Sequence, residues 1–469
     1  MEFFFAVFFL LFYYIRPQDW IPSLSGVGLI KPIIALWFFA LVAVRSRPSP
    51  LPGLARTPHD WAMFAYLAYI VFFADAGIMA VLPLLSFYML TVQSLNTWDR
   101  LKRYLKFWNG ALIVIASFAV LTKFGIDITS AENNHFTQMG RMAINTWLHD
   151  NPNALGHSVV VAIPASYLLY FWKQGFTSRW VVFPILAGIA FYCAWLTQSK
   201  GAYLVGGATV VMAFVIGKPK WLQAIALSAA ILGGIPALSF LPRMSEMGDL
   251  RSDEGVQGRL LAWEMAKTAE GNNPTGVGWN QFVAYIPWVE GTNHMIVTKA
   301  THSSYVQIGA DLGRYGLFLY IAAIWCAVHT LLVTKSADDT QERCRRVLLI
   351  FLIANVVSGW MINRQYHTEY FLLIAGAAAM HRLRKAEELA KLGTPEETDE
   401  KPGLSPKTLV EELRKAWTRK ETPAFIARPS ESLQKSKPLW HRFGSLDLAC
   451  SVGLTWLTLR LWTYVLENF

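Results

Sequence analysis

His302 is the residue with the clearest potential for catalysis, because it stands between a long polar loop and an apolar segment. It begins the sequence His302-Ser303, which is followed after nine residues by Gly313-Arg314-Tyr315-Gly316. On a helix, His302, Gly309 and Gly313 share one face, and Gly309 and Gly313 form a G-x-x-x-G pair that permits close helix packing. An imidazole near its ordinary pKa can take a proton from an attacking hydroxyl. The glycines alone predict only a tightly packed helix, so a catalytic role depends on the neighbouring residues.

A cluster of cations precedes His302 in the polar loop 241–301, made of Arg243, Arg251, Arg259, Lys267 and Lys299. A guanidinium suits phosphate because its planar fork donates two parallel hydrogen bonds. Arg259, Trp263 and Lys267 are spaced four residues apart, which places them on one face of a helix. The cluster predicts a phosphate site formed by Arg251 and Arg259 beside Trp263, although a solvated loop also explains Arg243 and Arg251.

A further cation, Lys200, stands between two apolar segments in Ser199-Lys200-Gly201-Ala202. A charge at the edge of the hydrocarbon layer faces a cavity or partner, or extends to the membrane surface. In the first case, Lys200 and Arg259 could hold a diphosphate together. Arg364 and His367, in the last loop on the same side, could join them.

The composition predicts an all-α polytopic membrane protein. Hydrophobic residues form 54% of the 469-residue chain and charged residues only 16%. Apolar runs predict twelve transmembrane helices, with one large periplasmic loop carrying short helices. The 302–333 run is too long for one span, so its first turns should lie in the periplasmic layer. The predicted spans are 3–15, 26–44, 61–74, 76–94, 107–122, 154–172, 180–197, 201–216, 221–240, 302–333, 347–362 and 367–380.

Basic residues in alternate loops orient the chain. They place the N-terminus in the cytoplasm and the loop 241–301 in the periplasm. The transmembrane domain then covers 1–380, followed by a flexible cytoplasmic tail over 381–448. An apolar or amphipathic helix over 449–469 ends the chain. We expect it at the membrane interface, with a cytoplasmic C-terminus, rather than as a thirteenth span.

The net charge of +10 is explained by attraction to anionic membrane lipids, and nothing in the sequence indicates nucleic acid as a partner. The four cysteines lie in predicted spans or on the cytoplasmic side, so we expect no disulfide. The loop around His302 lacks carboxylates or His and Cys residues at ligand spacing, so we expect neither a metal nor another cofactor.

These residues together resemble a family. The order of the motifs is similar to that in the O-antigen ligase and O-antigen polymerase superfamily of bacterial inner-membrane proteins. The motifs are, in order, Ser199-Lys200-Gly201-Ala202, Arg259 before Trp263, the stretch 274–278, and His302-Ser303 with Gly313 and Gly316. The sequence Asn151-Pro152-Asn153-Ala154 also resembles the Asp-Pro-Asn turn of this family. The resemblance covers 140–380 and is specific over 255–316. Lys200 departs from it, since the family usually has an arginine there, and lysine lacks the bidentate fork.

The resemblance implies transfer of a glycan from a polyprenyl-diphosphate carrier to an acceptor hydroxyl at the periplasmic face, with inversion of the sugar. His302 and Arg259 would be catalytic, and the substrate would contact Lys200, Arg251, Trp263, Ser303 and Arg364. An O-antigen ligase with a glycolipid acceptor such as lipid A-core is the leading reading. A polymerase of glycan repeats or a protein oligosaccharyltransferase would use the same residues. A lipid-glycan flippase or transporter is an alternative of another class, for which Asp75 is the one obvious buried acid.

Overall fold

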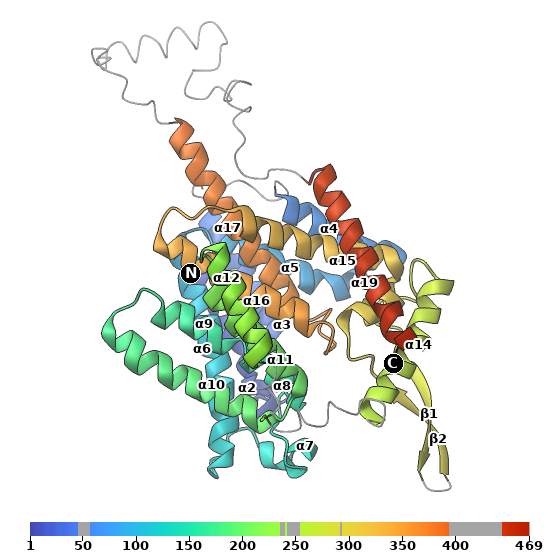
Figure 1. Ribbon diagram of the computed structural model, residues 1–469. Helices are drawn as coiled ribbons and strands as arrows, with labels where there is room; N and C mark the ends of the chain where they lie inside the picture. Colours follow the sequence, from blue (N-terminus) through green and yellow to red (C-terminus); the bar gives the residue numbers. More distant parts are fainter. Residues whose placement is uncertain (46–56, 235–239, 242–253, 291–292, 394–442, 469) are drawn as a thin grey trace, which may run out of the picture.

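The computed structural model describes residues 1–45, 57–234, 240–241, 254–290, 293–393 and 443–468, and this part of the chain is mostly helical (Figure 1). Four helical segments within it are long and apolar enough to cross a membrane: Trp98–Lys123, Pro152–Phe171, Ser178–Thr197 and Ser304–Val333. Large apolar side chains also cover the outside of the bundle, such as Phe39, Phe72 and Leu232, whose exposed fractions are 67, 78 and 77%. Such a surface is stable in lipid rather than in water, so the protein is a multi-pass membrane protein.

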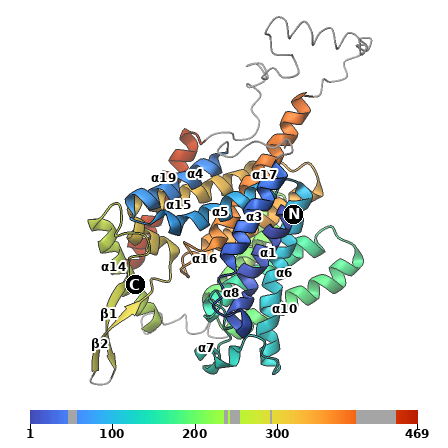
Figure 2. The same ribbon diagram turned by 180° about the vertical axis from the view of Figure 1, so that it is seen from behind.

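Each of the twelve predicted spans overlaps a helix, although the number that cross the membrane stays a prediction. Helices α1, α3 and α6 pack side by side, as Figure 2 shows. The helices that match the predicted spans are α1 (Glu2–Ile15), α3 (Ile30–Arg45), α4 (Pro58–Phe73), α5 (Ile78–Ser94), α6 (Trp98–Lys123), α8 (Pro152–Val159) with α9 (Ala162–Ser166) and η3 (Tyr167–Phe171), η4 (Ser178–Val182) with α10 (Phe183–Thr197), α11 (Lys200–Val215), α12 (Lys220–Ala229) with η5 (Ala230–Gly234), α15 (Ser304–Val333), α16 (Asp339–Ser358) and α17 (Thr368–Gly393).

The loops predicted for the periplasmic side meet one another. The Trp147 backbone N–H donates to the Asp19 carboxylate over 2.8 Å, and the Trp147 ring stacks on His367 with centroids 5.1 Å apart. The Trp279 N–H donates to the Ala74 carbonyl over 2.8 Å. Loops that follow the first, third, fifth, ninth and eleventh predicted spans therefore gather at one end, which we call the site end.

The loops predicted for the cytoplasmic side meet at the opposite end. Arg100 pairs with Glu2 over 2.5 Å, and Lys173 pairs with Asp339 over 2.6 Å. The Trp98 indole donates to Glu387 over 2.6 Å. The two sets of contacts agree with the alternation of loops that the charges predicted, and which end faces the periplasm stays a prediction.

Helix α15 is broken at Gly313, where φ is 64° and ψ is −171°. The loop that follows α14 (Glu254–Asn272) docks into this break: the N–H groups of Val277 and Gly278 donate to the carbonyls of Ala310 and Asp311 over 3.0 and 2.9 Å. A Cβ on Gly313 would collide with the Pro274 carbonyl oxygen. The break divides the long run into a short section at the site end and 314–333, and whether the first turns lie outside the span stays a prediction.

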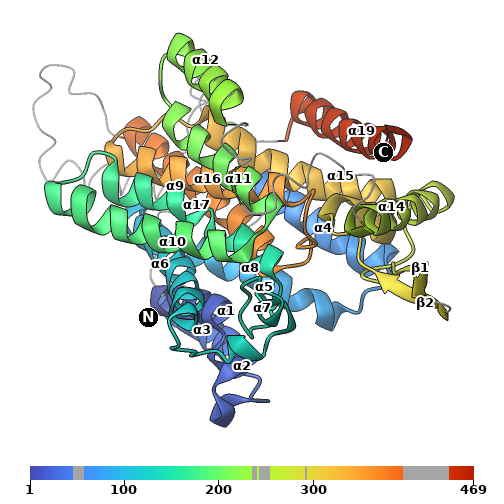
Figure 3. The ribbon, with the colours of Figure 1, turned by 60° about the horizontal axis from the view of Figure 1, so that its bottom comes forward.

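The structure has two further features that the sequence did not predict, and it contains the helix predicted for the end of the chain. A hairpin of β1 (Ala284–Glu290) and β2 (Asn293–Lys299) follows the docked loop, with Ile286 opposite Val297. Helix α17 continues past residue 380, and its buried Arg382 pairs with Asp60 over 2.8 Å. The rest of the predicted tail, 394–442, lies outside the described residues. The chain ends in α19 (Ser445–Asn468), which packs along α15 and reaches α14 (Figure 3).

Replacing Gly313 by alanine should destabilise the protein by about 2 kcal/mol or more, because the added Cβ meets backbone and the positive φ is strained. Gly110→Ala in α6 is the matched control, since nothing lies within 4 Å of its Cβ position, and it should be neutral or slightly stabilising. Thermal unfolding in detergent measures both. Equal melting temperatures for the two variants would show that the break does not need glycine.

Candidate active site

His302 lies in the short connection between β2 and α15, with a left-handed backbone (φ 50°) that is uncommon for a residue other than glycine. Its neighbour Thr301 is fixed on two sides. The Trp263 indole of α14 donates to the Thr301 carbonyl over 2.7 Å, and the Thr301 hydroxyl lies 3.0 Å from Oδ1 of Asn363. Strained backbone held by surrounding contacts is a frequent feature of active sites.

The two serines after His302 fix the start of α15. The buried Ser303 hydroxyl accepts the Val306 N–H over 3.4 Å as the helix N-cap, and it donates to the Gly359 carbonyl over 3.3 Å. Ser304 donates to the Ile362 carbonyl over 2.9 Å. The structure thus gives Ser303 a capping role, and its contact with substrate stays a prediction.

Among the described residues, the charges that act on the His302 ring are cations. Burial first, and then the charges of Arg259 and Lys299, lower the pKa of the His302 imidazole to about 4. No hydrogen bond occupies the His302 ring within the described part of the chain. At neutral pH the ring is therefore uncharged and can accept a proton from a bound molecule.

The segments that carry the two predicted phosphate-binding cations lie near a second histidine, His157 of α8. Arg259 is within electrostatic range of both His302 and His157. On the other side, a Cβ on Gly201, next to Lys200, would lie 2.8 Å from Nε2 of His157. The fold therefore brings the Lys200 turn and the Arg259 helix to the same end of the molecule, around His157.

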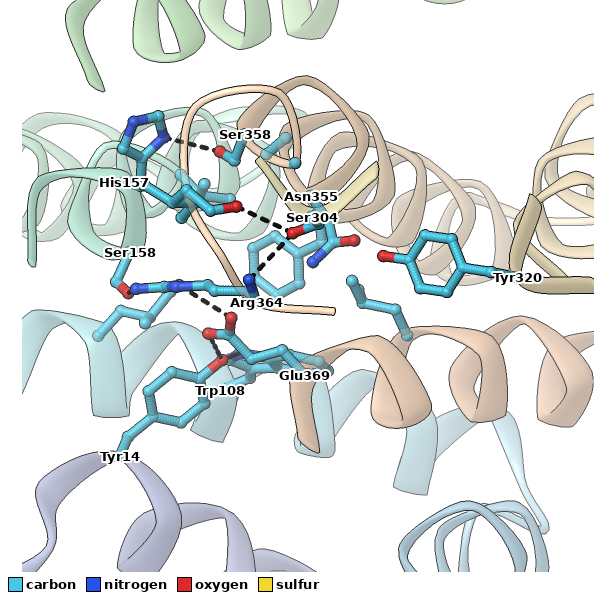
Figure 4. A pocket seen from close by; sticks show the side chains of 17 residues that line it. Tyr14, Trp108, His157, Ser158, Ser304, Tyr320, Asn355, Ser358, Arg364 and Glu369 are labelled. Carbon is cyan, nitrogen blue, oxygen red and sulfur yellow. Dashed lines mark hydrogen bonds and ion pairs between the residues drawn. The ribbon is translucent and has the colours of Figure 1, made fainter. Parts of the chain in front are cut away.

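Arg364 is committed to the protein rather than open to a ligand. Its guanidinium pairs with Glu369 over 2.8 Å and donates to the Ala154 carbonyl and the Ser158 hydroxyl over 2.6 and 2.8 Å. Figure 4 shows Arg364 between Ser158 and Glu369, with Tyr14 donating to the same carboxylate over 2.6 Å. The cavity beside this network has about 50 Å³, room for one or two waters but not for a sugar. A contact of Arg364 with substrate stays a prediction.

A larger cleft of about 500 Å³ opens next to the His302 connection, lined by Thr298, Lys299, Ala300 and the start of α15. Four aromatic side chains line it: Trp147, Trp279, Phe282 and Tyr366. Four amide side chains alternate with them: Asn280, Gln307, Asn363 and Gln365. Flat apolar rings beside neutral hydrogen-bonding groups suit a ligand with apolar faces and a hydroxylated rim.

Some of these residues could be found from the sequence and others could not. Arg259 and Trp263 lie on α14 as predicted; the Trp263 indole donates to Thr301, and its contact with substrate stays a prediction. Arg251 and Arg243 lie outside the described residues. His157 was missed, and its one signal was its position in the turn that begins Asn151-Pro152-Asn153. Asn151 does cap α8 there, by accepting the Asn153 N–H over 2.9 Å.

Among the described residues, no group of three His, Cys, Asp or Glu side chains is placed to hold a metal ion. The expectation that no metal or other cofactor takes part stays a prediction.

These features define the class as a multi-pass membrane protein whose polar loops build a basic site with a neutral histidine at one end. Residues 185–321 match the family model for O-Antigen ligase. This part of the chain is therefore an O-antigen ligase domain, of the O-antigen ligase and polymerase type that transfers glycans at membranes, as the His302 sequence predicted. The match includes Lys200, Arg259, Trp263, His302 and Ser303 and excludes Arg364. No curated protein matches the chain.

The lowered pKa of His302 can be tested without substrate. Diethylpyrocarbonate modifies neutral imidazole, so the rate of modification of the His302 peptide, followed by mass spectrometry, should stay constant from pH 8 to about pH 5 and fall below it. Lys299→Met removes one of the charges that oppose protonation, so the fall should begin at higher pH. A wild-type midpoint near the ordinary value of about 6.5 would contradict the proposed neutral site.

Proposed function

We propose that this protein transfers a glycan from a polyprenyl diphosphate to an acceptor hydroxyl, as an O-antigen ligase, at the periplasmic face of a bacterial inner membrane. The proposal rests on the buried His302, whose imidazole pKa is lowered by burial and by the charges of Arg259 and Lys299, next to a cleft lined by aromatic and amide side chains. The N-terminus would then be cytoplasmic and the site end periplasmic.

His302 acts on the acceptor in this mechanism. Its ring takes the proton of the acceptor hydroxyl while the oxygen attacks the anomeric carbon, and the bond from that carbon to the phosphate oxygen breaks. Direct attack inverts the anomeric centre. The proton then passes to solvent, and the polyprenyl diphosphate leaves with the bonding electrons.

Arg259 acts on the donor. Negative charge grows on the diphosphate as it leaves, and a fixed guanidinium stabilises that charge in a partly dehydrated site. Lys200, in the turn next to His157, supplies a second charge, with Arg251 as a further contact. Trp263 and Ser303 act by holding Thr301 and the start of α15, and Arg364 by holding α8 to α17.

The aromatic and amide cleft is suited to the sugar. Sugar rings stack their C–H faces on aromatic side chains and exchange hydrogen bonds with amides. Among the described residues, the Trp279 indole nitrogen, Gln365 Oε1 and His367 Nδ1 have no hydrogen-bond partner. These three atoms are buried behind the cleft surface, so the hydrogen bonds to a sugar would come from exposed amide groups such as that of Asn280.

A polymerase or a protein oligosaccharyltransferase would use the same chemistry. Deleting the gene separates them: glycan polymer left on its carrier indicates a ligase, and single repeats on the acceptor indicate a polymerase. The structure does not favour a transporter, because Asp75 is exposed in the turn between α4 and α5.

Substitutions of His302 and Arg259 should fail in different ways. In purified protein, His302→Ala should lower kcat by about two to four orders of magnitude with donor binding nearly unchanged, the usual size of a general-base contribution. Arg259→Ala should also raise the donor KM, since a phosphate contact is lost in both ground and transition states. Lys200→Ala should behave like Arg259→Ala, whereas Lys200→Arg should retain activity because it restores a bidentate donor.

The matched controls are His135→Ala and Lys123→Ala. Both side chains are exposed: His135 lies in the loop 124–151, and Lys123 is the last residue of α6. Both should transfer glycan at the wild-type rate. A His302→Ala protein as fast as these controls would remove His302 from the mechanism.

Transfer should not need a metal, because the leaving diphosphate can be neutralised by Arg259 and Lys200. Activity of purified protein should therefore persist after treatment with EDTA. Loss of activity that magnesium or manganese restores would contradict this part of the proposal.

A further inference from the structure

Helix α19 lies antiparallel to α15 and contacts it at both ends. Near its start, the buried Asp447 carboxylate accepts from Trp325 Nε1 over 3.0 Å and lies 2.7 Å from His329 Nδ1. Near its end, the buried Trp462 ring fills the space over Gly309, where a Cβ would lie 2.8 Å from the ring. Trp325 and His329 belong to the far half of α15 and Gly309 to the site end, so α19 covers most of the length of α15.

The helix is long enough to cross a bilayer, although it is not one of the four segments that are also apolar enough by composition. Its 24 residues extend about 36 Å at 1.5 Å per residue, against a hydrocarbon core of about 30 Å. All three views of the ribbon place the C-terminus beside α14 (Figures 1, 2 and 3).

The side chains of α19 are distributed as in a membrane helix and not as in an interfacial one. The face on α15 carries the small polar residues Ser451 and Thr455, both buried. The opposite face exposes large apolar residues along its whole length: Leu446, Val452, Trp456, Leu457, Leu461 and Tyr464. An interfacial helix would present a polar face to water instead.

Arg460 fits this placement. It is exposed two residues before Trp462, and its guanidinium lies 5.9 Å from the Trp456 ring centre. Trp462 is level with Gly309 near the site end, so the long Arg460 side chain can reach the headgroups of that side.

Trp462 also connects α19 to the catalytic residues. Its indole donates to the Trp263 carbonyl of α14 over 3.2 Å, and the Trp263 indole in turn donates to the Thr301 carbonyl over 2.7 Å. The Lys267 ammonium of α14 lies 5.0 Å from the Trp462 ring centre. One side of α14, the helix that carries Arg259, thus rests on the end of α19.

We infer that α19 crosses the membrane as an additional span, that it places the C-terminus on the same side as His302, and that Trp462 is a positioning residue for α14. This differs from the interfacial helix and cytoplasmic C-terminus expected from the sequence. The role of Trp462 rests on the proposed glycan transfer, whereas the topology does not.

Single cysteines test the topology in a chain whose four native cysteines are replaced by alanine. In intact spheroplasts, an impermeant thiol reagent should label Asn468→Cys as it labels Met139→Cys in the exposed loop of the site end. It should spare Ser445→Cys as it spares Lys335→Cys, between α15 and α16. Asn468→Cys and Ser445→Cys that label alike would show that α19 does not cross.

Trp462→Ala tests the positioning role. It should raise the donor KM about fivefold to tenfold, since α14 loses one hydrogen bond and its packing surface, and Trp462→Phe should recover part of this. The matched control is Trp37→Ala, which removes an equally buried indole that donates to Ser94 over 2.8 Å, away from α14.

Trp37→Ala should lower the melting temperature as much as Trp462→Ala but leave the donor KM unchanged. An unchanged KM in Trp462→Ala would overturn the positioning role. A wild-type protein without transferase activity would instead overturn the proposed function, and the cysteine labelling would still decide the topology.

Discussion

The break in α15 at Gly313 is the constraint on which the geometry of the site depends. A break leaves helix carbonyls without their ordinary partners, and in an apolar surrounding each needs a donor. The Val277 and Gly278 amides supply two, and the Tyr69 hydroxyl donates to the Leu312 carbonyl over 3.0 Å. The same contacts fix the loop that follows α14, so one backbone feature joins α4, α14 and α15.

Asp311 extends this junction toward the cleft. Its carboxylate accepts the Phe282 N–H over 2.8 Å and the Tyr366 hydroxyl over 2.9 Å, and Gln307 lies within 3.3 Å. These donors come from the loop before β1, the last outer turn and α15 itself. A carboxylate beside His302 would favour the imidazolium, whereas burial and the charges of Arg259 and Lys299 keep the ring neutral, and those charges also favour an anionic leaving group.

The sequence was sufficient for the parts that depend on local pattern. Apolar runs located the helices, four-residue spacing placed Arg259 and Trp263 on one helix, and the His302 motif identified the domain. It was not sufficient for parts that depend on distant partners. The same glycines that suggest helix packing serve two purposes: Gly309 admits Trp462, and Gly313 breaks the helix for a loop. The contacts of Arg364 with Ala154 and Ser158 need α8 to lie beside the start of α17, which no local pattern contains.

The position of Arg259 illustrates why such distant contacts matter for catalysis. Helix α14 is not anchored by a broad apolar face, since Leu261 and Met265 are exposed by 43 and 38%. Its buried side, at Ala262 and Ala266, instead has small residues that allow close approach. Close approach alone does not fix the position of a helix along its axis. Two directional hydrogen bonds fix it here: the Trp263 indole donates to the Thr301 carbonyl, and the Trp462 indole donates to the Trp263 carbonyl. The distance between the guanidinium and the imidazole is thereby set by residues that touch neither substrate.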